Sequence, residues 1–222
     1  MKLEEILAKM NIEIGEREST LFDLYYGNLI SWNEKFNLTA VTERSEVDLK
    51  HFADSLTALS YFPKGARLVD VGSGAGFPAI PLKIVRNDLE ITMLDALNKR
   101  VGFLKDTLAV LDIDGTALHL RAEEAAYTPM RESFDCATAR AVAKIKLLVQ
   151  YLLPLLKVGG RAVLYKGADV REELKEAESA IKTLGGVVTA ADRRDFEGFG
   201  RTIVVIDKVF STPFCYPKRK IK

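Results

Sequence analysis

The sequence predicts an α/β fold: a mostly parallel seven-stranded sheet with an antiparallel edge strand, helices on both faces, and further helices at the N-terminus. Three patterns predict it. Residues 1–62 have the spacing of helices, whereas short apolar strand-like runs alternate with helical stretches from residue 67 onward. Such alternation is typical of parallel sheets, because parallel neighbours need a crossover between them. The last two strand-like runs have no helix between them, which predicts an antiparallel edge.

The N-terminal region, residues 1–62, is expected to form a helical extension packed on an α/β domain formed by residues 63–222. One apolar stripe at helical spacing predicts a long helix. Its members are Leu21, Leu24, Tyr25, Leu29, Trp32 and Phe36. Trp32 is expected to pack in the core rather than to stack on a base. Ser45 and Asp48 resemble a capping box that opens a second helix over residues 46–61, and Pro63-Lys64-Gly65 ends it.

Strand-like runs in the second region occur at residues 67–71, 90–94, 116–120, 134–138 and 161–165. The helical stretches between them include an amphipathic stripe over residues 101–111. A further helix over about 169–184 ends at Gly185-Gly186. The final pair of strand-like runs, 187–191 and 202–207, brings the predicted strands to seven.

Composition narrows the function classes. The chain has 222 residues, of which 48% are hydrophobic and 28% charged, as in ordinary globular proteins and unlike disordered chains. Its longest uncharged stretch, Val71 to Leu82, is shorter than the ~20 apolar residues of a membrane span. The two cysteines and two histidines form no metal or disulfide motif, and the N-terminus lacks a signal-peptide core. We therefore expect a cytoplasmic protein with no bound metal and no membrane association.

The most specific motif is the glycine-rich turn Asp70-Val-Gly-Ser-Gly-Ala-Gly-Phe-Pro78, which follows the first strand and opens a helix. Glycines there let the backbone approach a ligand closely. A dinucleotide-binding turn has G-x-G-x-x-G, whereas here the third glycine comes one position early. An acidic residue before G-x-G-x-G is instead typical of Rossmann-like, class I methyltransferases that use S-adenosylmethionine; the alternative is a tight turn without a ligand. The predicted cofactor-binding residues of this turn are Asp70, Gly72, Ser73, Gly74, Gly76 and Phe77.

Two further cofactor positions follow the next strands. Asp95 and Ala96 end the second strand, where a carboxylate can accept hydrogen bonds from ribose hydroxyls; the alternative is a capping or solvent-facing Asp95. Ala122 and Glu123 follow the third strand, where such folds place groups around the adenine ring. The spacing gives equal weight to a second role for Glu123, the capping of the next helix.

Chemistry in this fold takes place beyond the carboxyl end of the fourth strand, which here has Thr138-Ala-Arg-Ala141. The sequence has no Asn/Asp-Pro-Pro-aromatic motif and no Pro-Cys nucleophile, and Cys136, within the strand, is expected in the core. Arg140 is a poor base but a good clamp for a phosphate, a carboxylate or a purine edge; the alternative is a structural salt bridge. We expect it to be the catalytic residue and to contact the cofactor. A site without a base favours an atom that is already nucleophilic, such as N7 of guanine.

Several motifs, in this order along the chain, make a resemblance that covers nearly its whole length. They are Trp32-Asn33, Asn37-Leu38-Thr39, His51-x-x-Asp54-Ser55-Leu56, the turn from Asp70 to Pro78, Arg121-Ala-Glu-Glu124, Arg140-Ala141, Lys166-Gly167 and Tyr216-Pro217-Lys218-Arg219. With them the chain resembles the bacterial ribosomal RNA small subunit methyltransferase G family, also called the glucose-inhibited division protein B family. One departure is Ala79, where a glycine is expected in that family.

The resemblance implies an activity: transfer of a methyl group from S-adenosylmethionine to N7 of a guanine in 16S ribosomal RNA, near the decoding region. The cofactor contacts that it implies fall on Gly72, Phe77, the stretch from Asp95, Ala122, Glu123 and Arg140. The expected partner is 16S rRNA or an assembling small ribosomal subunit, and a monomer is favoured.

Side chains expected to contact RNA come from three places. His51, Asp54 and Ser55 lie at i, i+3 and i+4 on one helix face, which would border the cofactor pocket; a hydrogen-bonded packing cluster explains that spacing equally well. Lys166 at a strand end is either a phosphate contact or a solvated lysine. Lys218 and Arg219 belong to a basic tail that either binds RNA or is a frayed chain end.

The net charge of +1 conceals an uneven distribution. Residues 1–24 carry three basic and six acidic side chains, whereas residues 193–222 carry eight basic and three acidic ones. Near neutrality is therefore a cancellation between the two ends and does not exclude nucleic acid, although we expect RNA shape and a splayed guanine to determine specificity. Three alternatives stay open from the sequence: a small-molecule methyltransferase, a ribosome-assembly factor that keeps the fold without turnover, and an NAD-linked reductase.

Overall fold

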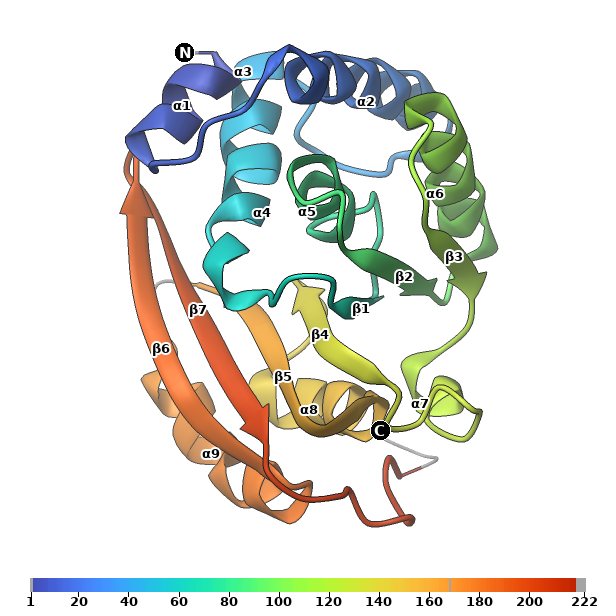
Figure 1. Ribbon diagram of the computed structural model, residues 1–222, viewed down its shortest axis with the longest axis vertical. Coiled ribbons are helices and arrows are strands. Elements are labelled where there is room, and N and C mark those ends of the chain that lie inside the picture. Colours follow the sequence, from blue (N-terminus) through green and yellow to red (C-terminus); the bar gives the residue numbers. More distant parts are fainter. Residues whose placement is uncertain (1, 168, 219–222) are drawn as a thin grey trace.

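The computed structural model describes residues 2–167 and 169–218, in which a seven-stranded sheet has the order β3-β2-β1-β4-β5-β7-β6 (Figure 1). The strands are β1 (Arg67–Val71), β2 (Glu90–Asp95), β3 (Thr116–His119), β4 (Phe134–Arg140), β5 (Leu156–Lys166), β6 (Gly186–Phe196) and β7 (Phe199–Lys208). Strands β1 to β5 pair in parallel. Strand β7 is inserted between β5 and β6 and is antiparallel to both. The predicted α/β class, the seven strands and the antiparallel edge are confirmed.

Adjacent residues of a strand enter two different hydrophobic cores. In β1, Leu68 belongs to one core and Val69 to the other, and both are fully buried. Helices α5 (Ala79–Val85) and α6 (Asn98–Leu111) contribute to the first core, and α7 (Ala122–Ala125), α8 (Ile145–Leu152) and α9 (Arg171–Thr183) contribute to the second. The period-2 alternation of strands therefore leaves both faces of the sheet covered, as parallel strands require. Cys136 is buried in the first core, as predicted, and burial raises the pKa of its thiol to about 12.

The N-terminal residues form several short helices around one long one. They are α1 (Leu3–Lys9), α2 (Glu16–Phe36), α3 (Arg44–Val47), a π-helical turn (Asp48–Ala53), α4 (Asp54–Leu56) and a 3-10 turn (Leu59–Tyr61). Figure 1 shows α2 across the top of the molecule, with α5 below it and α6 at the right. Buried side chains of α1, α2 and α4 belong to the same core as those of α5 and α6, so these elements share one hydrophobic interior.

Two details of the N-terminal prediction are wrong. The capping box at Ser45 does not form, because the carbonyl of Glu43 already accepts the amides of Glu46 and Val47 at 3.0 and 2.9 Å. The helix therefore starts before Ser45. The apolar stripe of α2 is also rotated from the predicted one: Leu24 is 45% exposed, and Phe22 is fully buried in its place. Phe22 packs on Phe52 of the π-helical turn, a contact that helical spacing alone does not reveal.

Trp32 is half-buried between helices, as predicted. Its ring packs against Phe103 of α6, with 5.8 Å between ring centroids. Its indole Nε1 donates a hydrogen bond of 2.8 Å to Asp106 Oδ2, which satisfies the polar end of the side chain. Trp32 thus joins α2 to α6.

Candidate active site

The glycine-rich turn between β1 and α5 has three glycines in the left-handed region, with φ of +70° at Gly72, +59° at Gly74 and +87° at Gly76. Residues with a side chain rarely adopt this backbone conformation. Space is also limiting, because a Cβ on Gly72 would lie 2.7 Å from Cγ2 of Val142, and one on Gly76 would lie 2.5 Å from Cδ1 of Ile80. The residue type at these positions is therefore dictated by the backbone.

Asp70 is the acidic residue at the start of this turn, and it is fully buried. Within the described part of the chain, neither carboxylate oxygen has a hydrogen-bond partner. Burial raises the pKa of this carboxyl to about 7, and the nearby Ser73 hydroxyl, the charge of Arg140 and the amide of Ala79 oppose that rise, although none of them forms a hydrogen bond of good geometry with it. A buried carboxylate without partners is costly, so the site fits a ligand that brings a cation such as an ammonium group.

Asp95 lies at the carboxyl end of β2, beside the turn. Its Oδ2 accepts the amide of Gly74 at 2.9 Å and its Oδ1 accepts the amide of Leu97 at 2.8 Å. Ala96 follows it at this edge. In the next strand, β3, His119 is the register partner of Asp95 and donates from Nε2 to the carbonyl of Ala96 at 3.0 Å.

Helix α7 begins just beyond β3, at the same edge of the sheet. The chain enters it at Leu120, whose amide donates to the carbonyl of Asp95 at 3.2 Å. Ala122, the first residue of α7, is buried, and Glu123 beside it is half-buried. The predicted positions after β1, β2 and β3 therefore all lie at one edge of the sheet, as the parallel register requires.

Arg140 ends β4, next to the turn. Its guanidinium lies over the ring of Phe77, 4.9 Å from the centroid. Its Nη1 donates to Asp54 Oδ2 at 2.7 Å and to the carbonyl of Lys50 at 3.2 Å. The side chain of Arg140 is 9% exposed, so its position is fixed by the N-terminal helices on one side and by the turn on the other.

Asp54 is shared by two arginines. Besides Arg140, it accepts hydrogen bonds from Nε and Nη2 of Arg201 at 2.7 and 2.8 Å. Arg201 lies in β7 and also donates to the carbonyl of Lys166 at 3.3 Å. From the sequence, Arg201 is only one of the basic residues of the C-terminal region. Its place just before the apolar strand residues 203–206 was the available indication of a specific role.

The predicted RNA contacts at Asp54 and Ser55 do not fit their placement. Both side chains are fully buried. The hydroxyl of Ser55 donates to the carbonyl of His51 at 2.6 Å, and the carboxylate of Asp54 is occupied by guanidinium groups. A strand of RNA on the surface cannot reach them. Asp54 and Ser55 therefore fit the alternative given for this helix face, a hydrogen-bonded packing cluster.

His51, the third member of that face, is half-buried and stacks on Phe77 with 4.5 Å between ring centroids. Its Nδ1 lies 3.3 Å from Nη2 of Arg140 and its Nε2 lies 2.9 Å from the hydroxyl of Thr39. Nδ1 also lies 3.1 Å from the carbonyl of Lys50, which can only accept, whereas arginine can only donate, so the two contacts of Nδ1 require opposite tautomers of the ring. Burial, followed by the charge of Arg140, lowers the pKa of His51 to about 4, so the ring is neutral at physiological pH.

Of the remaining predicted RNA contacts, Lys166 directly follows Tyr165, the register partner of Arg140 in β5. Nζ of Lys166 pairs with Glu173 at 2.8 Å and donates to the carbonyl of Ala143 at 3.1 Å, and the side chain is 12% exposed. Lys218 is exposed, with Nζ 5.8 Å from the ring centroid of Tyr216. Arg219 lies outside the described residues.

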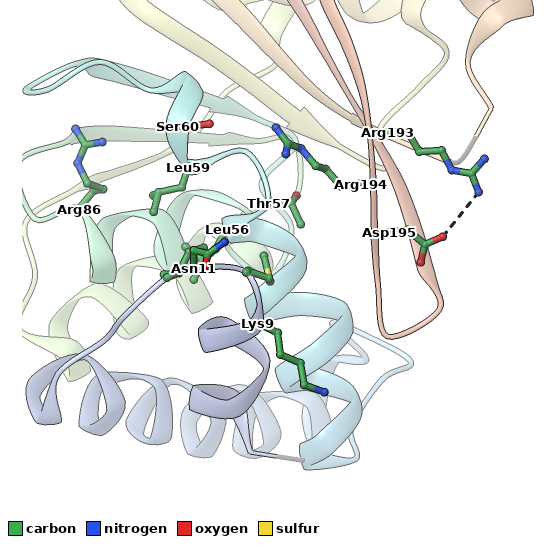
Figure 2. Close-up of a pocket in the computed structure, with 12 residues that line it drawn as sticks. Lys9, Asn11, Leu56, Thr57, Leu59, Ser60, Arg86, Arg193, Arg194 and Asp195 are labelled. Atoms are coloured by element: carbon green, nitrogen blue, oxygen red, sulfur yellow. Dashed lines mark ion pairs between the residues drawn. The ribbon is translucent and has the colours of Figure 1, made fainter.

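The basic residues of β6 line a pocket of about 710 Å³ between α1, the segment after α4 and the β6–β7 hairpin (Figure 2). In Figure 2 the side chain of Arg194 points across the pocket, whereas that of Arg193 points to the other side of the hairpin, toward Asp195 at 3.8 Å. Arg194 pairs with Asp192 at 3.7 Å. The pocket is separate from the glycine-rich turn, and the cations along its rim have carboxylate neighbours.

No helix in the described part of the chain is long and apolar enough to cross a membrane. Among residues 2–167 and 169–218, we find no group of three or more His, Cys, Asp or Glu side chains placed to hold a metal ion.

Comparison with known proteins adds to this geometry. A sequence model of the GidB family, described as rRNA small subunit methyltransferase G, matches residues 18–195. A protein named Ribosomal RNA small subunit methyltransferase G from Lactobacillus delbrueckii subsp. bulgaricus is 46% identical, over 97% of this chain and 93% of its own. The protein of the same name from Desulforamulus reducens is 43% identical, over 98% and 93% of the two chains.

Solved structures of low sequence identity share the fold. A ribosomal protein L11 methylase from Lactobacillus delbrueckii subsp. bulgaricus has a TM-score of 0.56 at 16% identity, over 72% of this chain and 80% of that chain. A SAM-dependent O-methyltransferase from Thermotoga maritima also has a TM-score of 0.56, at 14% identity, over 83% and 72% of the two chains. At such identities these structures support the architecture alone.

Proposed function

The chain belongs to the rRNA small subunit methyltransferase G family, and we propose that it transfers a methyl group from S-adenosylmethionine to N7 of one guanine in 16S ribosomal RNA. The observation that carries the proposal is a glycine-rich turn with the buried carboxylate of Asp70, next to Arg140, around which the described side chains leave no free base. The family match favours this activity over a small-molecule methyltransferase, a non-catalytic assembly factor or an NAD-linked reductase.

The residues that would hold the cofactor are those at the carboxyl edge of β1, β2 and β3. The buried carboxylate of Asp70 would take the ammonium group of the methionine part, because that cation supplies the partner that both oxygens lack. Asp95 and Ala96 would contact the ribose, and Ala122 and Glu123 would flank the adenine. The turn itself, with its three glycines, gives the close approach of backbone that a ligand needs.

Methyl transfer to N7 needs no base. When bound, the cofactor supplies an activated methyl group on a positively charged sulfur. In transfer to N7, its lone pair would bond to the methyl carbon and the electron pair of the carbon–sulfur bond would remain on sulfur. No proton would have to leave the guanine, so the protein would need no base there. The protein then contributes mainly alignment, which can supply ~7–11 kcal/mol of the barrier.

The described side chains around Arg140 agree with this chemistry. Asp54 is neutralised by two guanidinium groups, and burial lowers the pKa of His51 to about 4. Both are therefore weak acceptors for a proton from a substrate at physiological pH. Arg140, which is always charged, would clamp the target nucleotide through its phosphate or its purine edge.

The partner would be 16S rRNA, as naked RNA or as part of an assembling small subunit, in the cytoplasm. Arg193, Arg194 and Lys218 are exposed cations that would contact phosphates, and His51 and Lys166 would lie closer to the target nucleotide. Residues 1–62 would act as an extension of a methyltransferase domain formed by 63–222, and we expect a monomer.

The activity is tested by incubating the protein with methyl-labelled S-adenosylmethionine and three forms of substrate: naked 16S rRNA, small subunits arrested during assembly, and mature small subunits. All three should come from cells without the gene, so that the target is unmodified. We expect label in the RNA of at least one form and none in ribosomal protein. Absence of label from every RNA form would overturn the proposal.

A further inference from the structure

Tyr25 of α2 reaches from the N-terminal helices to the glycine-rich turn. Its side chain is fully buried, and its hydroxyl donates a hydrogen bond to the carbonyl of Ala75. The two residues are 50 positions apart in the chain. Burial raises the pKa of the Tyr25 hydroxyl well above its ordinary value, so the group stays protonated and remains a donor at physiological pH.

This contact holds the turn from the side opposite the sheet. On the sheet side, the carbonyl of Leu94 accepts the amides of Gly72 and Ser73 at 2.8 and 3.1 Å. Asp95 accepts the amide of Gly74 at 2.9 Å. The carbonyl of Ala75 instead points to α2, so two different parts of the chain fix the backbone of one turn.

The ring of Tyr25 touches the turn a second time. It packs against Phe77, with 5.5 Å between ring centroids, and a Cβ on Gly76 would lie 2.7 Å from the Tyr25 hydroxyl oxygen. Phe77 is in turn contacted by His51 and Arg140 on the side of the proposed reaction site. Tyr25 therefore supports both the backbone that would bind the cofactor and the ring on which Arg140 lies.

We propose that Tyr25 is a positioning residue of the cofactor site: its hydroxyl holds the carbonyl of Ala75 and thereby the conformation of the glycine-rich turn. The N-terminal helices then form part of the cofactor site instead of only covering the sheet. This inference rests on the proposed function, because it takes the turn to be the binding site of S-adenosylmethionine.

The test compares two neighbouring tyrosines of α2. Tyr25→Phe removes the hydroxyl and keeps the ring. Tyr26→Phe is the matched control, because its hydroxyl donates to the carbonyl of Thr42 at 3.0 Å, in a loop outside the turn. Binding of S-adenosylhomocysteine is measured by calorimetry. We expect Tyr25→Phe to weaken it roughly fivefold, the effect of one lost uncharged hydrogen bond, and Tyr26→Phe to leave it unchanged.

Two further readouts separate positioning from a general loss of stability. At saturating S-adenosylmethionine, kcat of Tyr25→Phe should stay within twofold of the wild type while KM for the cofactor rises. Amide hydrogen exchange of residues 72–77 in the cofactor-free protein should be faster in Tyr25→Phe and unchanged in Tyr26→Phe.

The inference is overturned if Tyr25→Phe binds S-adenosylhomocysteine as the wild type does, or if Tyr26→Phe is weakened equally. Failure of the proposed function would give a different result, because the wild-type protein would then bind S-adenosylhomocysteine but label no RNA. If the wild type does not bind S-adenosylhomocysteine at all, the exchange of residues 72–77 alone decides whether Tyr25 holds the turn.

Discussion

Asp54 and Arg140 are 86 positions apart in the chain and form a hydrogen-bonded ion pair of 2.7 Å, with the Asp54 side chain fully buried and that of Arg140 9% exposed. The pair joins the N-terminal helices to the end of β4. Arg201 completes it from β7, so one carboxylate fixes two guanidinium groups of different strands. Removal of the carboxylate would leave both arginines without their shared counter-charge in a buried site.

Asp54→Asn should therefore lower the free energy of unfolding by about 3–5 kcal/mol, the usual cost of breaking a buried ion pair from one side. Urea denaturation measures it. Glu176→Gln is the control, because Glu176 pairs with Lys144 at 3.4 Å between exposed side chains, where such pairs contribute about 1 kcal/mol or less. Equal losses in the free energy of unfolding would show that the ion pairs of Asp54 stabilise the protein no more than a surface pair does.

Arg140→Gln should reduce methyl transfer about 10- to 100-fold, as expected for the loss of hydrogen bonds from a charged donor, while the protein stays folded. The rate is measured with labelled S-adenosylmethionine and the RNA form that the wild type labels best. Lys144→Gln, a few residues further along the chain at an exposed ion pair, should retain activity. Retention of full activity by Arg140→Gln would remove this residue from the mechanism.

Gly76→Ala should abolish binding of the cofactor and destabilise the protein, because φ is +87° and a Cβ would lie 2.5 Å from Ile80 Cδ1. Gly65→Ala is the matched control: φ is +66°, but no atom lies within 4 Å of the added Cβ. Both variants share backbone strain of about 1–2 kcal/mol, and only the first adds a clash at the turn. Calorimetry with S-adenosylhomocysteine distinguishes them; normal binding by Gly76→Ala would contradict the assigned turn.

The pKa of Asp70, raised by burial to about 7 from 3.8, predicts two effects of pH. The folded protein binds a proton there at pH values where the unfolded chain has lost it, so this group's stabilising contribution is present below about pH 4 and is lost as pH rises through 7. Affinity for a ligand with an ammonium group should change in the opposite sense and increase from pH 6 to 8, because ionised Asp70 is the better partner.

Calorimetric titration of S-adenosylhomocysteine at several pH values tests that second effect. Arg140 and Asp95 also act on the Asp70 carboxyl, the first lowering its pKa and the second raising it. Asp70→Asn isolates the Asp70 contribution: it should bind more weakly and show a flatter pH profile. A wild-type profile without any rise above pH 6 would argue against Asp70 as the ammonium partner.

The double variant Arg193→Ala, Arg194→Ala should bind RNA less tightly and with a weaker dependence on salt. If both guanidinium groups contact single-stranded phosphates, the slope of log K against log salt should become shallower by roughly 1.4. Arg171→Ala, in an exposed ion pair on α9, should leave the slope unchanged. An unchanged slope in the double variant would place the RNA elsewhere on the surface.

Features that depend on local backbone chemistry were predictable from the sequence. The turn from Asp70 to Pro78 needs glycine at three positive φ values, and its place after a strand follows from the apolar run before it. The meeting of Asp70, Asp95 and Arg140 at one edge of the sheet follows from the alternation of strands and helices, because parallel strands bring their carboxyl ends to one edge. Trp32 was expected in the core because it lies on an apolar stripe at helical spacing.

Features that depend on distant contacts were not predictable. Arg201 and Asp54 are 147 positions apart, and only the path of β7 beside β5 brings them together. The spacing of His51, Asp54 and Ser55 placed them on one face, as observed, but did not show that the face turns inward. In the same way, the stripe of α2 identified Tyr25 as a core residue without indicating that its hydroxyl reaches Ala75.

The central claim, methylation of guanine N7 in 16S rRNA, is tested most directly by mapping the modified nucleotide. Small-subunit RNA labelled by the protein is digested and analysed by mass spectrometry, and the labelled position is checked for the base-sensitive, positively charged ring of 7-methylguanosine. We predict one methyl group on N7 of a single guanine. A methyl group on a ribose, on an exocyclic amine or on N1 of a guanine would contradict it, because each of those requires removal of a proton. Of the described groups beside Arg140, Asp54 is held by two guanidinium groups and burial lowers the pKa of His51 to about 4.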